Sequence, residues 1–305
     1  MTEIRHFKQS EIDTLKWDQC IAKSINGIIY AYSWYLDIVC QDWEALVYGD
    51  YEMVMPLTQN RKYGFNYLYQ PFFTQQLGIF SSNKIDQSLI KLFLEAIPSK
   101  YKFIEINLNK YNDIEKLDGF EIRKNTTYEL DLIHNYEDIF RKYKKNNIRN
   151  IRKAIENKIS IVNGLKPEEI LDLVNSSGIF PGMNKKGIEK LHRLIRAAIS
   201  YKTGYLYGAY NQSNALCAAG FFVFSNQKAC FILSVSSKDG KTQSAMFLLV
   251  DEFIKDFSGQ NMILDFEGSN IEGIARFYKG FGAKAFNYPT IKSNKLPFPA
   301  NLLKN

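Results

Sequence analysis

The feature that most constrains the fold of this chain is an order of predicted elements that occurs twice. In the first copy, residues 44–57 read as two strands joined by a Gly-Asp turn, and residues 85–109 as an apolar helix followed by a strand. In the second copy, residues 205–237 read as three strands with polar turns, and residues 242–266 again as an apolar helix and a strand. Strands that lead into a helix and a further strand predict a mixed sheet with helices packed on it.

The spacing within the two copies supports a duplication. Tyr48 and Ile104 are 56 positions apart, and so are Tyr207 and Ile263. We therefore expect an α/β (α+β) fold of two tandem domains, each a mixed β-sheet flanked by helices. The expected division is an N-terminal domain over residues 1–135, a basic helical connector over residues 136–158 and a C-terminal domain over residues 159–305.

Composition agrees with a folded chain. Of its 305 residues, 46% are hydrophobic and 23% are charged, which suits one large or two medium globular domains. The first 17 residues mix charges without an apolar stretch, so they do not read as a signal peptide. No apolar run approaches the roughly 20 residues of a membrane helix. We expect a cytoplasmic protein without a membrane span.

The cysteines and histidines predict no metal site. No two cysteines form C-x-x-C, and none has a histidine nearby, so zinc sites and disulfide frameworks are disfavoured. Buried free thiols are the expected state. The residues concerned are Cys20, Cys40, Cys217, Cys230, His6, His134 and His192.

Positive charge is concentrated in one segment. The net charge is +7, and residues 141–158 hold eight basic residues and one acidic residue. Apolar residues at helical spacing predict helices here with one face on the core and the Lys/Arg side chains outside. Two interpretations stay open: a solvated helix face, or a phosphate-contacting surface for tRNA, a nucleotide or CoA. The second interpretation assigns phosphate contacts to Lys145, Arg149, Arg152 and Lys153.

Two short motifs carry a resemblance to a known family. The run RNIRKA joins the two halves at residues 149–154, and GSNIEGIARFYKGFGA follows the last predicted strand at residues 268–283. In this order they resemble the Fem-like double-domain members of the GNAT acyltransferase superfamily, over about residues 30–290. The resemblance implies two tandem GNAT-like domains and transfer of an acyl or aminoacyl group to an amine. It implies acyl-CoA or aminoacyl-tRNA as the donor substrate, and no bound cofactor.

The sequence departs from the peptidoglycan branch of that family at two places. That branch has a Gln-x-x-x-Trp run followed by Lys near the N-terminus, where this chain has AYSWYLDIV with Asp37 and no Lys. It also has a Gly-Pro run followed by an acid, where this chain has QPFFTQQ with Gln75 and Gln76. Both positions help to hold a UDP-muramyl peptide in that branch, so the departures argue against a peptidoglycan acceptor.

Residues 263–283 predict a strand, a turn and a helix. A capping box of Ser269 and Glu272 should start the helix at Asn270. Amine acylation needs a base for the amine proton and an acid for the leaving group. Glu267, at the strand's C-terminal end, is the candidate base. The resemblance makes Tyr278 the candidate general acid, because it matches the GNAT pattern Tyr-x-x-x-Gly-apolar. The alternative is that Glu267 is a solvated strand-end acid and Tyr278 a core aromatic residue.

The candidate donor site is the connection between a strand and the apolar helix at residues 234–247. The resemblance implies that the CoA pyrophosphate binds at this junction, against backbone N–H groups and the positive helix end. Of the usual Arg/Gln-x-x-Gly-x-Gly/Ala pattern, SKDGKT keeps only Gly240 in register, and Thr242 or Ser244 could cap the helix. A plain polar connection is the alternative. The assigned donor-binding residues are Ser236, Ser237, Gly240, Lys241 and Thr242.

Together these interpretations predict an N-acyltransferase whose active site lies in residues 159–305, with a small-molecule amine as acceptor and tRNA as partner if it supplies the donor. The N-terminal half would shape the acceptor cleft or have lost catalysis. The alternative is a non-catalytic nucleotide- or tRNA-binding protein on a GNAT-like scaffold.

Overall fold

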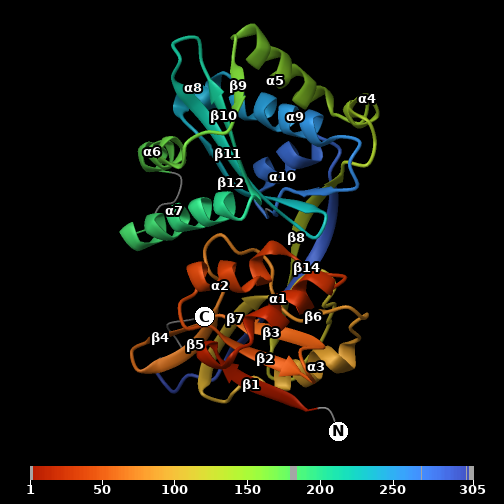
Figure 1. Cartoon of the computed structure of the whole chain (residues 1–305), viewed down its shortest axis with the longest axis vertical. Coiled ribbons are helices and arrows are strands. Elements are labelled where there is room, and N and C mark those ends of the chain that lie inside the picture. The colour runs from red at the N-terminus through yellow and green to blue at the C-terminus, as the bar shows by residue number, and fades with distance from the viewer. Residues whose placement is uncertain (1–2, 179–183, 269, 300, 302–305) are drawn as a thin grey trace. The chain divides into compact units, whose positions relative to one another are not determined.

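The chain forms two compact units in the computed structural model, which describes residues 3–178, 184–268, 270–299 and 301. Unit 1 comprises Met1–Thr126 and Asn287–Asn305, and unit 2 comprises Thr127–Phe286 (Figure 1). Two strands carry the chain from one unit to the other: β8 (Glu121–Asp131) and β14 (Lys284–Asn294). Mixed sheets flanked by helices occur in both units, so the predicted fold class is confirmed.

The units differ from the sequence-based domains at two places. The basic helical segment lies inside unit 2 and is no separate connector, and the residues from Asn287 onward belong to unit 1. Strand pairing explains the second difference. Strand β14 runs antiparallel to β7 (Tyr101–Asn107), with Thr290 opposite Asn107, and so completes a sheet of unit 1. A pairing between such distant segments leaves no local periodicity to read.

Unit 1 contains two sheets. The first is antiparallel, with the order β1-β2-β3-β6, and the second is mixed, with the order β4-β5-β7-β14-β8. Helix α3 packs Ile90 and Phe93 against Ile104 and Ile106 of β7 in the core. The remaining elements are β1 (Ile4–Lys8), η1 (Gln9–Glu11), α1 (Thr14–Lys23), η2 (Ile29–Ala31), α2 (Ser33–Val39), β2 (Glu44–Tyr48), β3 (Met53–Leu57), β4 (Gln59–Lys62), β5 (Phe65–Tyr69), β6 (Phe80–Ser81) and α3 (Gln87–Glu95).

Unit 2 is built on one mixed sheet with the strand order β8-β13-β12-β11-β10-β9. Strand β13 runs antiparallel to β8 and parallel to β12. Its elements are α4 (Tyr136–Phe140), α5 (Lys145–Glu156), β9 (Ser160–Asn163), α6 (Pro167–Ser177), α7 (Lys185–Ser200), β10 (Gly204–Tyr210), β11 (Leu216–Ser225), β12 (Lys228–Ser236), α8 (Lys238–Thr242), α9 (Ala245–Phe257), β13 (Ile263–Asp265) and α10 (Glu272–Lys279).

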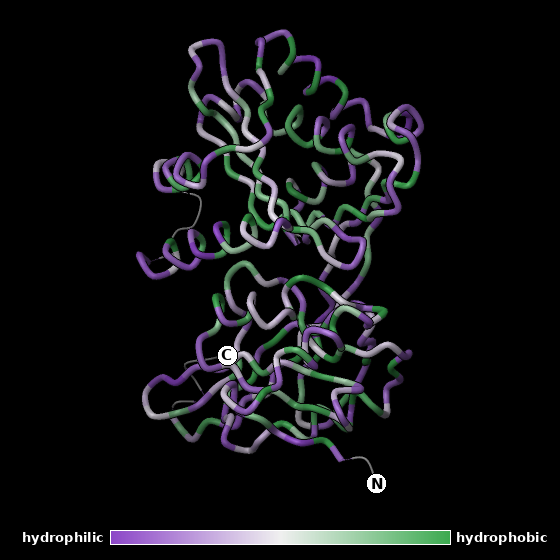
Figure 2. Tube along the Cα trace, in the orientation of Figure 1, coloured by the Kyte–Doolittle hydropathy of each residue, from purple (hydrophilic) through white to green (hydrophobic). Residues whose placement is uncertain are grey.

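Helices cover both faces of the unit 2 sheet. On one face, the ring of Phe253 in α9 stacks on Phe222 with centroids 3.7 Å apart. On the other face, the segment leading into α6 comes so close that a Cβ on Gly208 would lie 2.7 Å from Leu165. Helix α5 packs on the outside of α9 (Figure 1). Hydrophobic residues follow the strands and α9, whereas hydrophilic residues mark the outer turns of α5 and α7 (Figure 2).

Charge is divided unevenly between the units. Unit 2 holds 22 Lys/Arg and 16 Asp/Glu residues, and unit 1 holds 17 and 16, so nearly all of the basic excess lies in unit 2. In the part of the chain that the structure describes, no helix has both the length and the apolar character needed to cross a bilayer.

Candidate active site

The centre of unit 2 is a place where two parallel strands part. Strand β12 pairs with β13 only through residues 228–230, which lie opposite residues 263–265. Beyond this short ladder β12 continues to Ser236, with a register shift against β11 near Ile232 that bends the strand. Because parallel strands that part expose backbone groups between them, this end of the sheet is a natural position for a site.

Glu267 lies just past the end of β13. The strand ends at Asp265, earlier than predicted, and Glu267 is a left-handed residue with φ 56°. Its backbone N–H donates to Asp265 Oδ1 at 3.0 Å. A left-handed backbone is uncommon in residues other than glycine and costs energy that neighbouring contacts must offset. The turn therefore gives Glu267 a fixed orientation that a regular strand would not.

The structure brings Tyr278 close to Glu267. Tyr278 lies in α10, is 8% exposed, and stacks its ring on Phe266 at 4.8 Å. Burial raises the pKa of the Tyr278 phenol, and the nearby charges of Glu267 and Asp265 raise it further. A raised pKa keeps the phenol protonated at neutral pH, the state that a general acid requires. Its ring is part of the hydrophobic core of unit 2.

The predicted helix start was wrong by two residues. Helix α10 begins at Glu272 with Ile271 as its N-cap, and Ile271 makes no side-chain cap. Ser269, the other half of the predicted capping box, lies outside the described residues. Within α10, Ala275 and Tyr278 are buried, whereas Ile274 and the N-cap Ile271 are exposed.

A buried ion network under the turn was missed by sequence reasoning. Lys228 Nζ lies 2.6 Å from Glu129 Oε1 and 3.1 Å from Asp265 Oδ2. The Thr127 hydroxyl donates to Asp265 Oδ1 at 2.8 Å. Asp265 thus joins three strands and also accepts the Glu267 N–H, so it holds the turn that presents Glu267. No local pattern marks it, since its partners come from β8 and β12.

The predicted donor connection contains an extra short helix, α8. Ser237 is its N-cap and accepts from the Gly240 N–H at 3.0 Å. Lys241 and Thr242 are exposed, and Ser236 and Ser237 are half-buried. The Ser244 hydroxyl donates to Asn150 Oδ1 of α5 at 2.8 Å, so neither Thr242 nor Ser244 caps α9 with its side chain. The connection therefore lies at the predicted strand–helix junction. It also contains α8 and is hydrogen-bonded to α5.

The packing around Gly240 leaves no room for a side chain. It is buried, and a Cβ at this position would lie 2.0 Å from the Cys217 carbonyl oxygen. Gly240→Ala should destabilise unit 2 by about 1–3 kcal/mol or more, because backbone has to move to make room. The matched control is Gly273→Ala in α10, where a Cβ meets nothing within 4 Å and should stabilise the helix by about 0.5–1 kcal/mol. Urea unfolding measures both, and equal stability of the two variants would refute the packing explanation.

The four predicted phosphate-contacting residues share one face of α5. Lys145, Arg149, Arg152 and Lys153 are all exposed, whereas Asn147, Ile151 and Ala154 on the opposite face are buried. Arg149 donates to Asn146 Oδ1 at 3.0 Å, and none of the four forms an ion pair within the described residues. The predicted amphipathic helix is therefore confirmed, and the four cationic side chains on its exposed face have no acidic partner among the described residues.

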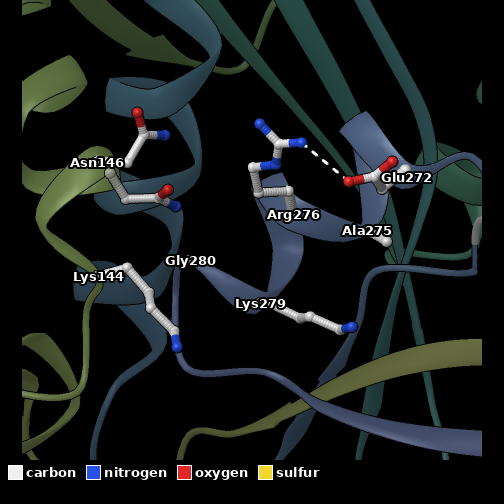
Figure 3. Close-up of a pocket in the computed structure, with 8 residues that line it drawn as sticks. Lys144, Asn146, Glu272, Ala275, Arg276, Lys279 and Gly280 are labelled. Atoms are coloured by element: carbon white, nitrogen blue, oxygen red, sulfur yellow. Dashed lines mark hydrogen bonds and ion pairs between the residues drawn. The ribbon is translucent and has the colours of Figure 1, made fainter.

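A cavity beside the start of α5 adds three cations that were not predicted as site residues. Its volume is about 360 Å³, and Lys144, Arg276 and Lys279 reach it from α5 and α10 (Figure 3). Arg276 is held by Glu272 at 3.0 Å, as the dashed line in Figure 3 marks. Lys144 is the N-cap of α5 and makes no side-chain cap, so the helix end adds its positive dipole. The cavity also includes Asn147, whose buried Oδ1 accepts no hydrogen bond from any residue that the structure describes.

At the corresponding place in unit 1, side chains bridge the two parallel strands. There β5 runs parallel to β7 as far as Tyr69 opposite Glu105. Beyond this point Gln70 Oε1 accepts the Asn107 N–H at 2.9 Å, and the Asn107 side chain donates to the Gln75 carbonyl at 2.9 Å. These hydrogen bonds join the segment after β5 to the end of β7, so the two strands of unit 1 stay connected beyond their ladder.

Mixed sheets flanked by helices in both units agree with a tandem GNAT-like fold, as comparison with solved structures shows. No family model matches the sequence, and no curated protein matches it at a significant level. Solved structures do match over the whole chain. The structure described as FemX has a TM-score of 0.69 at 10% identity, covering 98% of this chain and 99% of that chain. A tandem GNAT protein from the clavulanic acid biosynthesis pathway gives 0.62 at 11% identity, covering 97% and 99%. L-PGS from Bacillus licheniformis gives 0.56 at 13% identity, covering 95% of each chain. At these identities the likeness establishes the fold.

Proposed function

We propose that unit 2 transfers an acyl or aminoacyl group from an activated donor to an amine acceptor. The observation that carries this proposal is the meeting of Glu267 and Tyr278 where β12 and β13 part. Glu267 takes one proton from the ammonium group, and the resulting amine nitrogen forms a bond to the acyl carbon. The acyl–sulfur or acyl–oxygen bond then breaks as Tyr278 gives its proton to the departing thiolate or ribose oxygen, and the second nitrogen proton passes to the Tyr278 phenolate, which leaves a neutral amide. The shared fold with FemX and a tandem GNAT protein supports the same reaction class.

Aminoacyl-tRNA is the donor that unit 2 supports better than acyl-CoA. The SKDGKT connection folds as α8, and its single pattern glycine is needed for packing, so little remains of a pyrophosphate-binding loop. In contrast, α5 presents four exposed cations, and the cavity at its start adds three more. An extended basic surface of this kind suits a polymer of phosphates.

The donor assignment predicts a change in salt dependence. The Arg149→Ala, Arg152→Ala, Lys153→Ala triple variant should bind tRNA with a flatter dependence of log affinity on log salt concentration. The slope should fall by about 0.7–0.9 for each phosphate that the variant no longer neutralises. Fluorescence anisotropy of labelled tRNA between low and moderate salt measures it.

The matched control removes three exposed cations from α7, by Lys185→Ala, Arg193→Ala and Arg196→Ala. It has the same net charge as the α5 variant and leaves α5 intact. An unchanged slope in the α5 variant, or equal flattening in both variants, would show that α5 is not a specific phosphate surface.

A non-catalytic RNA- or nucleotide-binding protein is the second candidate, favoured by the burial of the Tyr278 ring. Such a protein keeps its RNA affinity but consumes no donor. Release of labelled amino acid from aminoacyl-tRNA, or of free CoA from acetyl-CoA, in the presence of mixed primary amines separates the two functions.

A further inference from the structure

We propose that a cavity in unit 1 binds a small primary amine in its protonated form. The cavity has a volume of about 320 Å³, at the lower end of the range for small-molecule sites. It lies on the face of the β5-β7-β14-β8 sheet that points away from the α3 core. Its lining residues are Tyr69, Gln70, Phe103, Glu105, Asn107, Arg123, Asn125 and Thr290.

The alternation of side chains along the strands places the residues that line the cavity on one face of the sheet. Along β7, Phe103, Glu105 and Asn107 alternate with Ile104 and Ile106, so they point to one face while the isoleucines enter the core. Tyr69 of β5 pairs with Glu105 across the ladder and lies on the same face. A carboxylate flanked by two aromatic side chains is an arrangement that favours a cation, through charge and through the ring faces.

The carboxylate of Glu105 keeps one oxygen for a hydrogen-bond donor of a ligand. Arg123 Nη2 lies 2.5 Å from Glu105 Oε1, and Arg123 Nε lies 3.7 Å from Glu121 Oε1. One guanidinium is therefore shared by two carboxylates, and Lys292 of β14 lies opposite Glu105 in the strand register. Within the described residues the second oxygen of Glu105 accepts no hydrogen bond, so it is open to a donor from a ligand.

The cavity floor is held by a chain of hydrogen bonds. The Thr290 hydroxyl donates to Asn107 Oδ1 at 2.6 Å and accepts from Asn125 Nδ2 at 2.5 Å. Gln70 accepts the Asn107 N–H at 2.9 Å. These contacts join β7, β8 and β14, so the groups around a ligand are ordered before it binds, and binding costs less entropy. Amide and hydroxyl groups here suit an amine that also carries a polar group.

This inference rests on the proposed function only in naming its acceptor: the amine class held in unit 1 is the class that unit 2 would acylate. All residues that line the cavity belong to unit 1. Unit 1 is nearly neutral, so an ammonium group meets far less general repulsion there than in unit 2.

The test is a calorimetric titration of the full chain with ethanolamine, in the absence of any donor. N-acetylethanolamine, which lacks the positive charge, should bind at least about tenfold more weakly. Glu105→Gln should weaken ethanolamine binding by about tenfold or more, as expected for removal of a charge-assisted hydrogen bond. The side chain of Glu105 is 40% exposed, so the variant should keep the wild-type melting temperature.

Glu121→Gln is the matched control, because it removes the same charge beside Arg123 at a position that does not line the cavity. It should change the affinity by less than about threefold. Stronger binding of glycolate than of ethanolamine, equal losses in the two variants, or no amine binding at all would overturn the proposal. Amine binding should persist in Tyr278→Phe even where turnover is lost, because Tyr278 does not line the cavity. Failure of the amine site can therefore be told apart from failure of the proposed reaction.

Discussion

Tyr278→Phe should lower the turnover of acyl transfer by roughly 10²-fold or more, because general acids contribute about 10²–10⁴ to rate. The substitution keeps the ring, which stacks on Phe266 at 4.8 Å, and removes only the hydroxyl. Within the described residues the hydroxyl makes no hydrogen bond, so the melting temperature should hardly move. Donor binding should also stay the same, since the cations of α5 are untouched. Turnover and melting temperature measured on one preparation check both expectations.

Tyr128→Phe is the matched control for this experiment. Tyr128 is 4% exposed, and its ring lies 6.1 Å from that of Tyr278, so the variant removes a neighbouring buried phenol hydroxyl. It should retain nearly normal turnover. Full activity in Tyr278→Phe, or equal losses in both variants, would exclude Tyr278 as the general acid and leave Glu267 with water as the proton carriers.

Lys228→Met should destabilise the protein by about 3–5 kcal/mol, the usual cost of leaving buried charges without their partner. Burial by itself would lower the pKa of Lys228, but the charges of Asp265 and Glu129 outweigh it and raise the pKa. A raised lysine pKa means that the stabilisation is fully present at neutral pH and is lost only as the pH rises through that value. Methionine keeps the length of the chain and leaves two buried carboxylates facing each other. Urea unfolding at pH 7 measures the destabilisation.

Lys255→Met is the matched control, because Lys255 forms an exposed pair with Glu252 at 3.8 Å. Exposed pairs contribute about 0–1 kcal/mol, so this variant should unfold almost as the wild type does. A destabilisation in Lys228→Met no larger than in the control would show that the ion network does not stabilise unit 2.

Local patterns alone predicted the features of this protein that lie within one stretch of chain. The duplicated order of strands, helix and strand follows from periodicity, and it is seen in β2, β3, α3 and β7 and again in β10 to β13. The outward cations of α5 follow from helical spacing. The closeness of Glu267 and Tyr278 could be predicted because 11 residues of one strand–turn–helix separate them. Each of these depends on neighbours along the chain, which periodicity records.

Only the tertiary structure decided the contacts that join distant segments. Strand β14 completes unit 1 because it pairs with β7, and the sequence-based boundary placed it in the other domain. Asp265 is tied to Thr127, 138 residues earlier, and to Lys228 in β12. Gly240 resembles a phosphate-loop glycine in sequence, yet the carbonyl of Cys217 is what excludes a side chain there. Hydrogen bonds, ion pairs and close packing of this kind depend on which strands become neighbours, and no local periodicity encodes that choice.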